Sequence, residues 1–236
     1  GSVHIFTTGA DAGQWERMQR LTQWDHDGVG HWYNGSFGSG LCVFGDWLVS
    51  GAPNFSKFDS QNKTAYVFHW NELDEVWEQH QALRVSGMTM YDLFASCVSG
   101  HGNRLVIGNQ QNESYGGVAY VYALDSDTEQ WQQTHTLQPT DLQNGDRFGL
   151  AAAVLDDRIV VAATHRGPGY VYVYDWNVDT ESWDETPLAA SDGSDSDLLG
   201  YGLALQGNVL VAGALGDDTA AGTDAGSVYV FEHNAS

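Results

Sequence analysis

Residues 37–53 read FGSGLCVFGDWLVSGAP, two apolar runs on either side of Gly45-Asp46. A Gly-Asp pair between such runs indicates a tight β-hairpin, because both residues tolerate positive φ. The hairpin recurs with a constant span of fourteen residues, from Phe37 to Gly51, Phe94 to Gly108, Phe148 to Ala162 and Leu199 to Gly213. The corresponding turns are Gly45-Asp46, Gly102-Asn103, Asp156-Asp157 and Gly207-Asn208. The sequence therefore predicts four copies of one hairpin with largely buried strands.

A second strand type repeats between the hairpins. Its copies are Val3–Phe6, Tyr66–Phe68, Tyr120–Tyr122, Tyr172–Tyr174 and Tyr229–Phe231. The first four are followed after nine residues by Trp15, Trp77, Trp131 and Trp183, each of which opens a further strand. Four strands repeated at this period are typical of β-propeller blades. No segment shows a capped helical period, so we expect an all-β fold of four-stranded antiparallel blades.

The stretch at Phe37–Pro53 resembles an FG-GAP repeat, the blade of the integrin α-subunit propeller. The resemblance extends over nearly the whole chain, and it implies an extracellular propeller that takes part in adhesion or protein binding. Integrin-type repeats often carry a calcium loop between the first two strands of a blade. Here Val43–Trp47 is only a tight turn, without room for the oxygen ligands of calcium. A fold hosts many functions, so the resemblance predicts the fold more strongly than the function.

We expect one domain over residues 1–236. Its repeat units span about 1–53, 63–110, 117–164 and 169–215, and a lone strand follows at 226–232. Two arrangements are open. The chain forms part of a larger propeller, or the first Trp strand completes the last unit and closes a four-bladed ring. An open arc would leave sheet faces and edges exposed, so we expect either further sequence of the same protein or a neighbouring subunit to cover its ends.

The composition is acidic, with 31 Asp and Glu against 9 Lys and Arg and a formal charge of −22. Nucleic acids and anionic membranes bind basic patches, so neither is an expected partner. No apolar run is long enough to cross a membrane as a helix. Aromatic residues make up 12% of the chain, which favours a packed fold over acidic disorder.

Five N-glycosylation sequons suggest a secreted or cell-surface protein, since composition alone gives about one or two. They begin at Asn34, Asn54, Asn62, Asn112 and Asn234, all outside the predicted strands. Cys42 and Cys97 occupy equivalent strands of adjacent units and are compatible with a disulfide or with two buried thiols.

The connection at residues 22–36 is the longest between a Trp strand and the next hairpin, and variable loops on a rigid scaffold often carry binding sites. Its aromatic and polar residues could stack on sugars, bind a divalent metal or plug the ring opening. They are Trp24, Asp25, His26, Asp27, His31, Trp32 and Tyr33.

Acidic residues near the last unit form two groups whose spacing is compatible with calcium. The groups are Asp192, Asp195 and Asp197, then Asp217, Asp218 and Asp224. Asp92, Asp146 and Asp197 each stand two residues before a hairpin, which favours a structural role in capping the turn into the blade.

No catalytic motif such as GxSxG, HExxH or CxxC is present, so we expect no enzyme, no catalytic residue and no required cofactor. The leading hypothesis is an extracellular propeller that binds protein partners or neighbouring subunits. The alternatives are a glycan-binding lectin that uses the 22–36 loop and an accessory domain of a secreted hydrolase.

Overall fold

A computed structural model describes residues 1–9, 13–22, 35–53, 63–89, 91–110 and 116–234. Across these ranges the secondary structure consists of β-strands and turns, without helix. The strands form five antiparallel sheets that follow one another in chain order. The expected all-β fold of four-stranded blades is confirmed.

The first sheet, here called the N-terminal pair, contains β1 (Ser2–Thr8) and β2 (Trp15–Thr22). Three complete blades follow. Blade I holds β3 (Leu41–Phe44), β4 (Trp47–Ala52), β5 (Thr64–Asn71) and β6 (Val76–Leu83). Blade II holds β7 (Phe94–His101), β8 (Arg104–Asn109), β9 (Val118–Asp125) and β10 (Gln130–Leu137). Blade III holds β11 (Phe148–Leu155), β12 (Arg158–Ala163), β13 (Tyr170–Asn177) and β14 (Ser182–Leu188).

The last sheet, here called the C-terminal sheet, contains only β15 (Leu199–Gln206), β16 (Val209–Ala214) and β17 (Ser227–Glu232). Each complete blade thus begins with the Phe-Gly hairpin and ends with the Trp strand. The repeat units predicted from the sequence instead begin with the Tyr-Val strand. The sheets divide the chain differently because the connection from the Trp strand to the next hairpin is the one that passes between blades.

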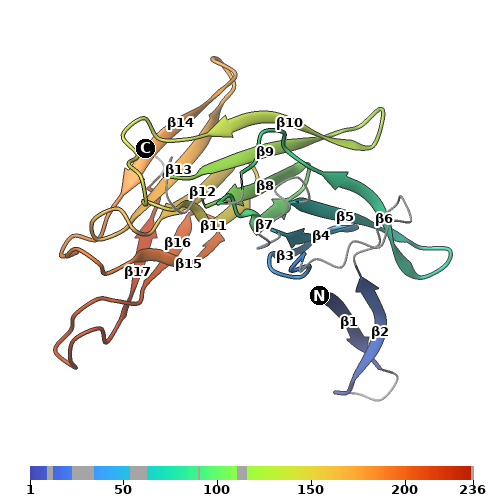
Figure 1. Cartoon of the computed structure of the whole chain (residues 1–236), viewed down its shortest axis with the longest axis horizontal. Helices are drawn as coiled ribbons and strands as arrows, with labels where there is room; N and C mark the ends of the chain where they lie inside the picture. Colours follow the sequence, from blue (N-terminus) through green and yellow to red (C-terminus); the bar gives the residue numbers. More distant parts are fainter. Residues whose placement is uncertain (10–12, 23–34, 54–62, 90, 111–115, 235–236) are drawn as a thin grey trace.

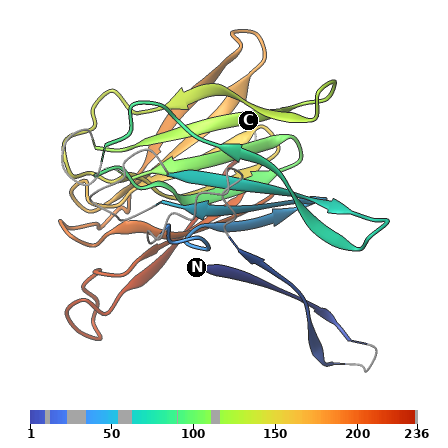
Figure 2. The ribbon, with the colours of Figure 1, turned by 45° about the vertical axis from the view of Figure 1, so that its right-hand side comes forward.

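The five sheets form an open arc, with the first strand of each blade toward its centre (Figure 1). The N-terminal pair and the C-terminal sheet lie at opposite ends of this arc, and the view turned by 45° shows the same separation (Figure 2). Among the described strands, β2 pairs only with β1, and β17 pairs only with β16. The pairing expected for a four-bladed ring is therefore absent from the described strands, and the alternative that the arc belongs to a larger propeller stays a prediction.

The two faces of each sheet pack against different neighbours. We call the face toward the following sheet the forward face and the opposite one the rear face. In blade II, Val106 and Val121 pair across the sheet on the forward face, and they pack with Ile159, Val161 and Tyr172 of blade III. Blade I packs on blade II in the same way, through Val49 and Val67. The cores thus lie between blades, as the nearly continuous apolarity of the strands predicts.

Glycines allow the blades to approach each other closely. A Cβ on Gly51 would lie 1.7 Å from the carbonyl oxygen of Ala95, and one on Gly108 would lie 2.1 Å from that of Gly149. Gly213 holds the equivalent place in the C-terminal sheet, where the nearest atom would be 3.9 Å away. At two junctions the next blade therefore leaves no room for a Cβ at this position, whereas Ala162 holds the equivalent place in blade III and is fully buried against the C-terminal sheet.

The Phe-Gly dipeptide bends the chain into each blade. Gly38, Gly149 and Gly200 have φ between 90° and 97°, a region that residues with a Cβ rarely occupy. Blade II has Ala95 at this position with φ 65°, which shows that the bend is kept even where glycine is absent.

Candidate binding surfaces

The predicted ligand loop lies outside the described residues. This holds for Trp24, Asp25, His26, Asp27, His31, Trp32 and Tyr33. The lectin, metal and plug hypotheses for this loop stay predictions. Four sequons, at Asn34, Asn54, Asn62 and Asn112, also lie outside the described residues, whereas Asn234 is described and exposed.

The Asp residues before the hairpins cap turns, as their regular spacing predicts. The backbone N–H of Thr89 donates to Asp92 at 2.5 Å, that of Gln143 to Asp146 at 2.8 Å and that of Ser194 to Asp197 at 2.6 Å. All three carboxylates belong to buried residues. Asp92 also accepts a bond from the Asn109 amide at 2.9 Å, which ties the turn to β8.

The six Asp residues proposed for calcium do not meet at one place. Tyr229 Oη contacts carboxylate oxygens of Asp192 and Asp217, each at 3.0 Å. Asp218 instead accepts a bond from the Asp224 backbone at 2.8 Å. The described residues contain no group of three or more His, Cys, Asp or Glu side chains suited to a metal ion. Turn amides and a phenol bind several of these carboxylates, and the calcium hypothesis for the two groups stays a prediction.

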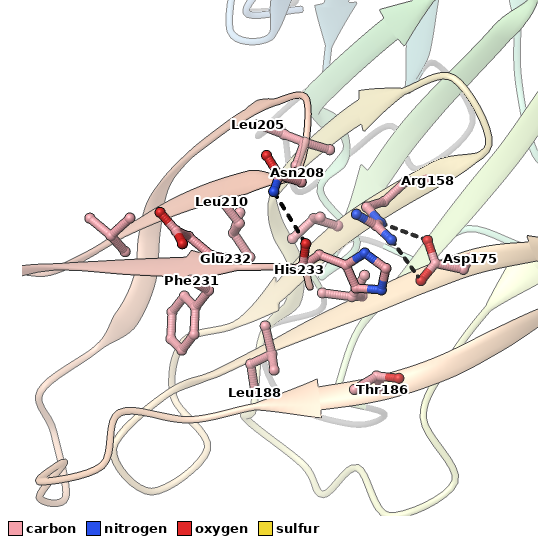
Figure 3. A pocket seen from close by; sticks show the side chains of 13 residues that line it. Arg158, Asp175, Thr186, Leu188, Leu205, Asn208, Leu210, Phe231, Glu232 and His233 are labelled. Atoms are coloured by element: carbon pink, nitrogen blue, oxygen red, sulfur yellow. Dashed lines mark hydrogen bonds and ion pairs between the residues drawn. The ribbon is translucent and has the colours of Figure 1, made fainter. Parts of the chain in front are cut away.

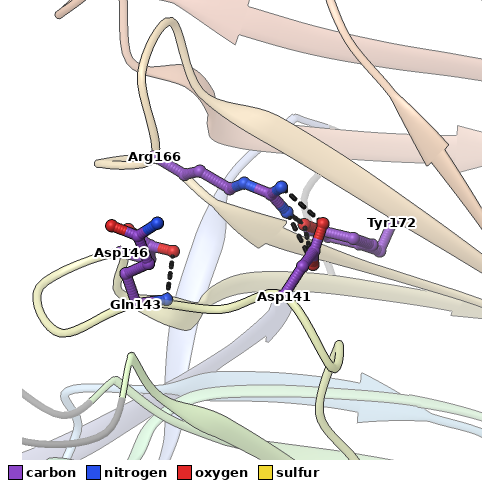
Figure 4. Close-up of polar contacts among 5 residues, drawn as sticks. All are labelled: Asp141, Gln143, Asp146, Arg166 and Tyr172. Atoms are coloured by element: carbon purple, nitrogen blue, oxygen red, sulfur yellow. Dashed lines mark hydrogen bonds and ion pairs between the residues drawn. The ribbon is translucent and has the colours of Figure 1, made fainter.

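One ion pair joins two connections at the edge of blades II and III (Figure 4). The Arg166 guanidinium contacts both carboxylate oxygens of Asp141, at 2.8 and 2.5 Å, and donates to the hydroxyl of Tyr172. Arg166 also lies over the ring of Tyr170, 4.6 Å from its centroid. The hydrogen bonds from Arg166 hold the pKa of Asp141 below its ordinary value. The cluster fixes the two connections, and every group in it already has a partner.

Cys42 on β3 and Cys97 on β7 are free thiols in adjacent blades. Burial, followed by the charge of Cys97, raises the pKa of Cys42 to about 12. Burial raises the pKa of Cys97 to about 11. Both thiols are therefore protonated and poorly reactive at neutral pH. A disulfide between them stays a prediction, which the mass of the unreduced protein would test.

The forward face of the C-terminal sheet is exposed and apolar. Val228 is 68% exposed and Val230 is 60% exposed, although their equivalents Ala119 and Val121 in blade II are both at 0%. A hollow of about 330 Å³ lies on this face between Tyr201, Gly213 and Val228. In the complete blades the Phe-Gly bend of the following blade lies against the glycine of this site, as Gly149 does against Gly108.

At the other end of the arc, the rear face of the N-terminal pair is exposed, and it also carries large apolar side chains. Phe6 is 52% exposed, whereas Phe68, its counterpart in blade I, is at 3%. Trp15 is 71% exposed, whereas Trp131, its counterpart in blade II, is at 1%. Arg17 and Arg20 stand on the same strand, so this end of an acidic chain is locally basic.

The sequence predicted that the ends of an open arc would expose sheet faces, but it did not identify the residues of these two faces as candidate sites. The residues themselves carry no signal of exposure, since valine and tyrosine alternate in β17 as they do in the buried β13.

Within the part of the chain that the structure describes, no helix is long and apolar enough to span a membrane.

Residues 131–174 and 183–231 match the family model described as FG-GAP repeat. Each match begins at a Trp strand or inside it and ends in the third strand of the next sheet, so it runs across the boundary between two sheets. No curated protein matches the chain.

Proposed function

Because residues 131–231 belong to the FG-GAP repeat family, we propose that the chain is a non-catalytic extracellular module that makes protein–protein contacts within a larger surface assembly. The observation that carries this proposal is the exposed apolar face of the C-terminal sheet. Exposed apolar patches on a folded domain commonly mark interaction sites. Here the patch occupies the same positions as a surface that is buried between blades elsewhere in the same molecule, with Val230 equivalent to Val121 and Val228 equivalent to Ala119.

The partner whose surface fits best is a second copy of the chain. Its N-terminal pair presents Phe6 at the place where Tyr122 of blade II packs against Val49 and Val67 of blade I. Phe6 of one copy would then meet Val211 and Val230 of the other. Arg17 lies opposite Phe6 in the N-terminal pair, and Glu232 lies opposite Val209 in the C-terminal sheet. A head-to-tail contact therefore brings opposite charges together beside the apolar residues.

Sedimentation of the chain over a wide concentration range tests this contact. We expect the mass to rise above the 25.8 kDa of one chain. Val230→Asp and Phe6→Asp should each abolish the rise, because each change places a charge in the apolar contact. A mixture of the two variants should regain a two-chain species, since one variant keeps its head and the other its tail. A wild-type chain that stays single at every concentration would contradict the proposal, as would a contact that only one variant disrupts.

We also propose that the protein is secreted and glycosylated. The support is the excess of sequons and the exposure of Asn234. Treatment of the protein from a secreting eukaryotic cell with an N-glycosidase should lower its mass by several glycans. Asn234→Gln should remove one of them, and an unchanged mass on treatment would contradict secretion through this route.

A further inference from the structure

A glutamine side chain links the outer strands of neighbouring sheets at two junctions. Gln19 of β2 donates to the backbone carbonyl of Trp77 at 3.0 Å and accepts from the backbone N–H of Trp77 at 2.8 Å. Gln81 of β6 binds the backbone of Trp131 in the same way, at 3.0 and 2.8 Å. A primary amide can make both bonds because its N–H and its C=O lie along one edge. Each glutamine therefore occupies the outward-facing backbone groups of the Trp in the next blade.

The same two backbone groups face outward in blade III. Trp176 stands opposite Trp183 and donates its N–H to the carbonyl of Asp157 at 2.8 Å, in the turn of the first hairpin. In blade II, Leu124 stands opposite Trp131 and donates to the equivalent turn. Such a pair of an antiparallel ladder exchanges no hydrogen bonds with each other. The backbone N–H and C=O of Trp183 are therefore directed away from β13, as those of Trp131 are from β9.

The junction between blades II and III lacks the glutamine. His135 stands opposite Val121 of β9, at the position where Gln81 stands opposite the equivalent valine of β5. The two nitrogens of an imidazole point in divergent directions, so the ring cannot bind both backbone groups. His135 instead packs edge-on against Trp176 and Trp183, with ring centroids 5.2 and 6.4 Å apart. No side chain of the described residues hydrogen-bonds to the backbone of Trp183.

A pocket of about 220 Å³, here called the rim pocket, lies between the two blades at this place. Its walls combine apolar surface with hydrogen-bonding groups. They come from His135, Thr136, Leu137 and Gln138 on one side and from Tyr174, Trp183 and Glu185 on the other. Leu137 and Tyr174 are buried, and the Tyr174 hydroxyl donates to the exposed Glu185 at 2.8 Å. Aromatic rings, an aliphatic side chain and a carboxylate therefore line the space beside the Trp183 backbone.

We propose that the rim pocket binds a small molecule that carries a primary carboxamide on an aromatic or aliphatic group. The carboxamide takes the place of the missing glutamine, donating to the backbone carbonyl of Trp183 and accepting from the backbone N–H of Trp183. Leu137 and the ring of Tyr174 then contact the apolar group. A secondary amide does not fit, because its trans geometry places N–H and C=O on opposite edges. A carboxylate does not fit either, because it only accepts and would lie near Glu185.

The rim pocket lies midway along the arc, so it is separate from the two exposed end faces and goes beyond the proposed function. A larger groove, of about 520 Å³, lies beside β17 between blade III and the C-terminal sheet (Figure 3). Val230 of the exposed forward face also lines that groove, so the groove belongs to the end of the arc.

Benzamide is the probe that tests the proposal, titrated into the isotope-labelled 236-residue protein and followed by nuclear magnetic resonance. We expect saturable binding with a dissociation constant of about 1 to 10 mM, the range for so small a ligand. The backbone N–H signal of Trp183 should shift. Those of Trp77 and Trp131 should stay unchanged, because glutamines already bind them. Benzoate and N,N-dimethylbenzamide should each bind at least about tenfold more weakly, because neither both donates and accepts.

Two substitutions of one residue provide a matched comparison. His135→Gln restores the side-chain amide of the other junctions, so it should abolish benzamide binding and raise the midpoint of thermal unfolding by about 2 °C. His135→Ala leaves the Trp183 backbone open and should keep the benzamide affinity within about fivefold, the loss expected for one ring contact.

Absence of benzamide binding would overturn the proposal, as would equal binding of the two control compounds. Binding that survives in His135→Gln would also overturn it, as would shifts at Trp77 and Trp131 as large as the shift at Trp183. Self-association is measured through Val230 and Phe6, which do not line the rim pocket, so the two proposals can fail independently.

Discussion

The junction between blades II and III and the open end beyond β17 are built from the same kinds of residue in the same places. At the junction Val121 is at 0% exposure, whereas at the open end Val230 is at 60%. Gly108 faces a carbonyl oxygen across the junction, whereas the nearest atoms to a Cβ on Gly213 belong to Gly202 of its own sheet, at 3.9 Å or more. The comparison shows that each repeat forms an apolar forward face, and that this face is buried only where another sheet packs against it.

The largest expected effect comes from adding one carbon to the junction glycine. Gly108→Ala would place a Cβ 2.1 Å from the backbone oxygen of Gly149, so the two blades must move apart. We expect a loss of about 3 kcal/mol in the free energy of unfolding, measured by urea denaturation. Gly213→Ala is the matched control and should change that free energy by less than about 0.5 kcal/mol. Equal effects at both positions would remove the distinction between junction and end.

The next effect comes from the paired valines. Val121→Ala removes two buried carbons from the core between blades II and III and should cost about 2 kcal/mol. Val230→Ala, measured at a concentration too low for self-association, should be close to neutral because the side chain is already in water. A similar loss at Val230 in the dilute protein would mean that something covers the C-terminal sheet.

A smaller effect should come from a side chain that links two Trp strands. The side-chain amide of Gln81 donates to the backbone carbonyl of Trp131 at 3.0 Å and accepts from the backbone N–H of Trp131 at 2.8 Å. Gln81→Ala leaves both backbone groups unpaired and should cost about 1 to 2 kcal/mol. Gln133→Ala, an exposed change on β10, should cost much less in the same thermal or urea experiment. If the two losses agree, the link between blades adds nothing to stability.

The smallest effect concerns the ion pair at the edge of the same junction. Since Arg166 lowers the pKa of Asp141 in the folded protein, the pair stabilises the fold above the unfolded pKa of about 3.9. This contribution is lost as the pH falls through the lower, folded value. Asp141→Asn should therefore lower the free energy of unfolding by a few tenths of a kcal/mol at pH 7, a small effect because the pair is exposed. At strongly acid pH the substitution should have no effect, because Asp141 is then protonated in the folded protein as well. Asp179→Asn, which removes an exposed carboxylate from a turn, is the control at pH 7 and should leave the free energy of unfolding nearly unchanged.

The sequence by itself determined the local structure, because the repeats and the Gly-Asp type turns depend only on neighbouring residues. The four hairpins, the Trp strands and the capping role of Asp92, Asp146 and Asp197 all follow from spacing. The calcium hypothesis stays a prediction, and spacing along the chain does not show that Tyr229 joins Asp192 of one group to Asp217 of the other. The aromatic loop proposed as a ligand site stays a prediction.

Only the tertiary structure decided which copies of the repeat are covered. Val121 and Val230 stand in the same strand type and in the same local sequence, so no pattern separates them. Their exposure depends on whether another sheet follows in space, and this is a property of the whole arc. The groove beside β17 is also a property of the tertiary structure, since it lies between two sheets and next to a strand that has one described neighbour.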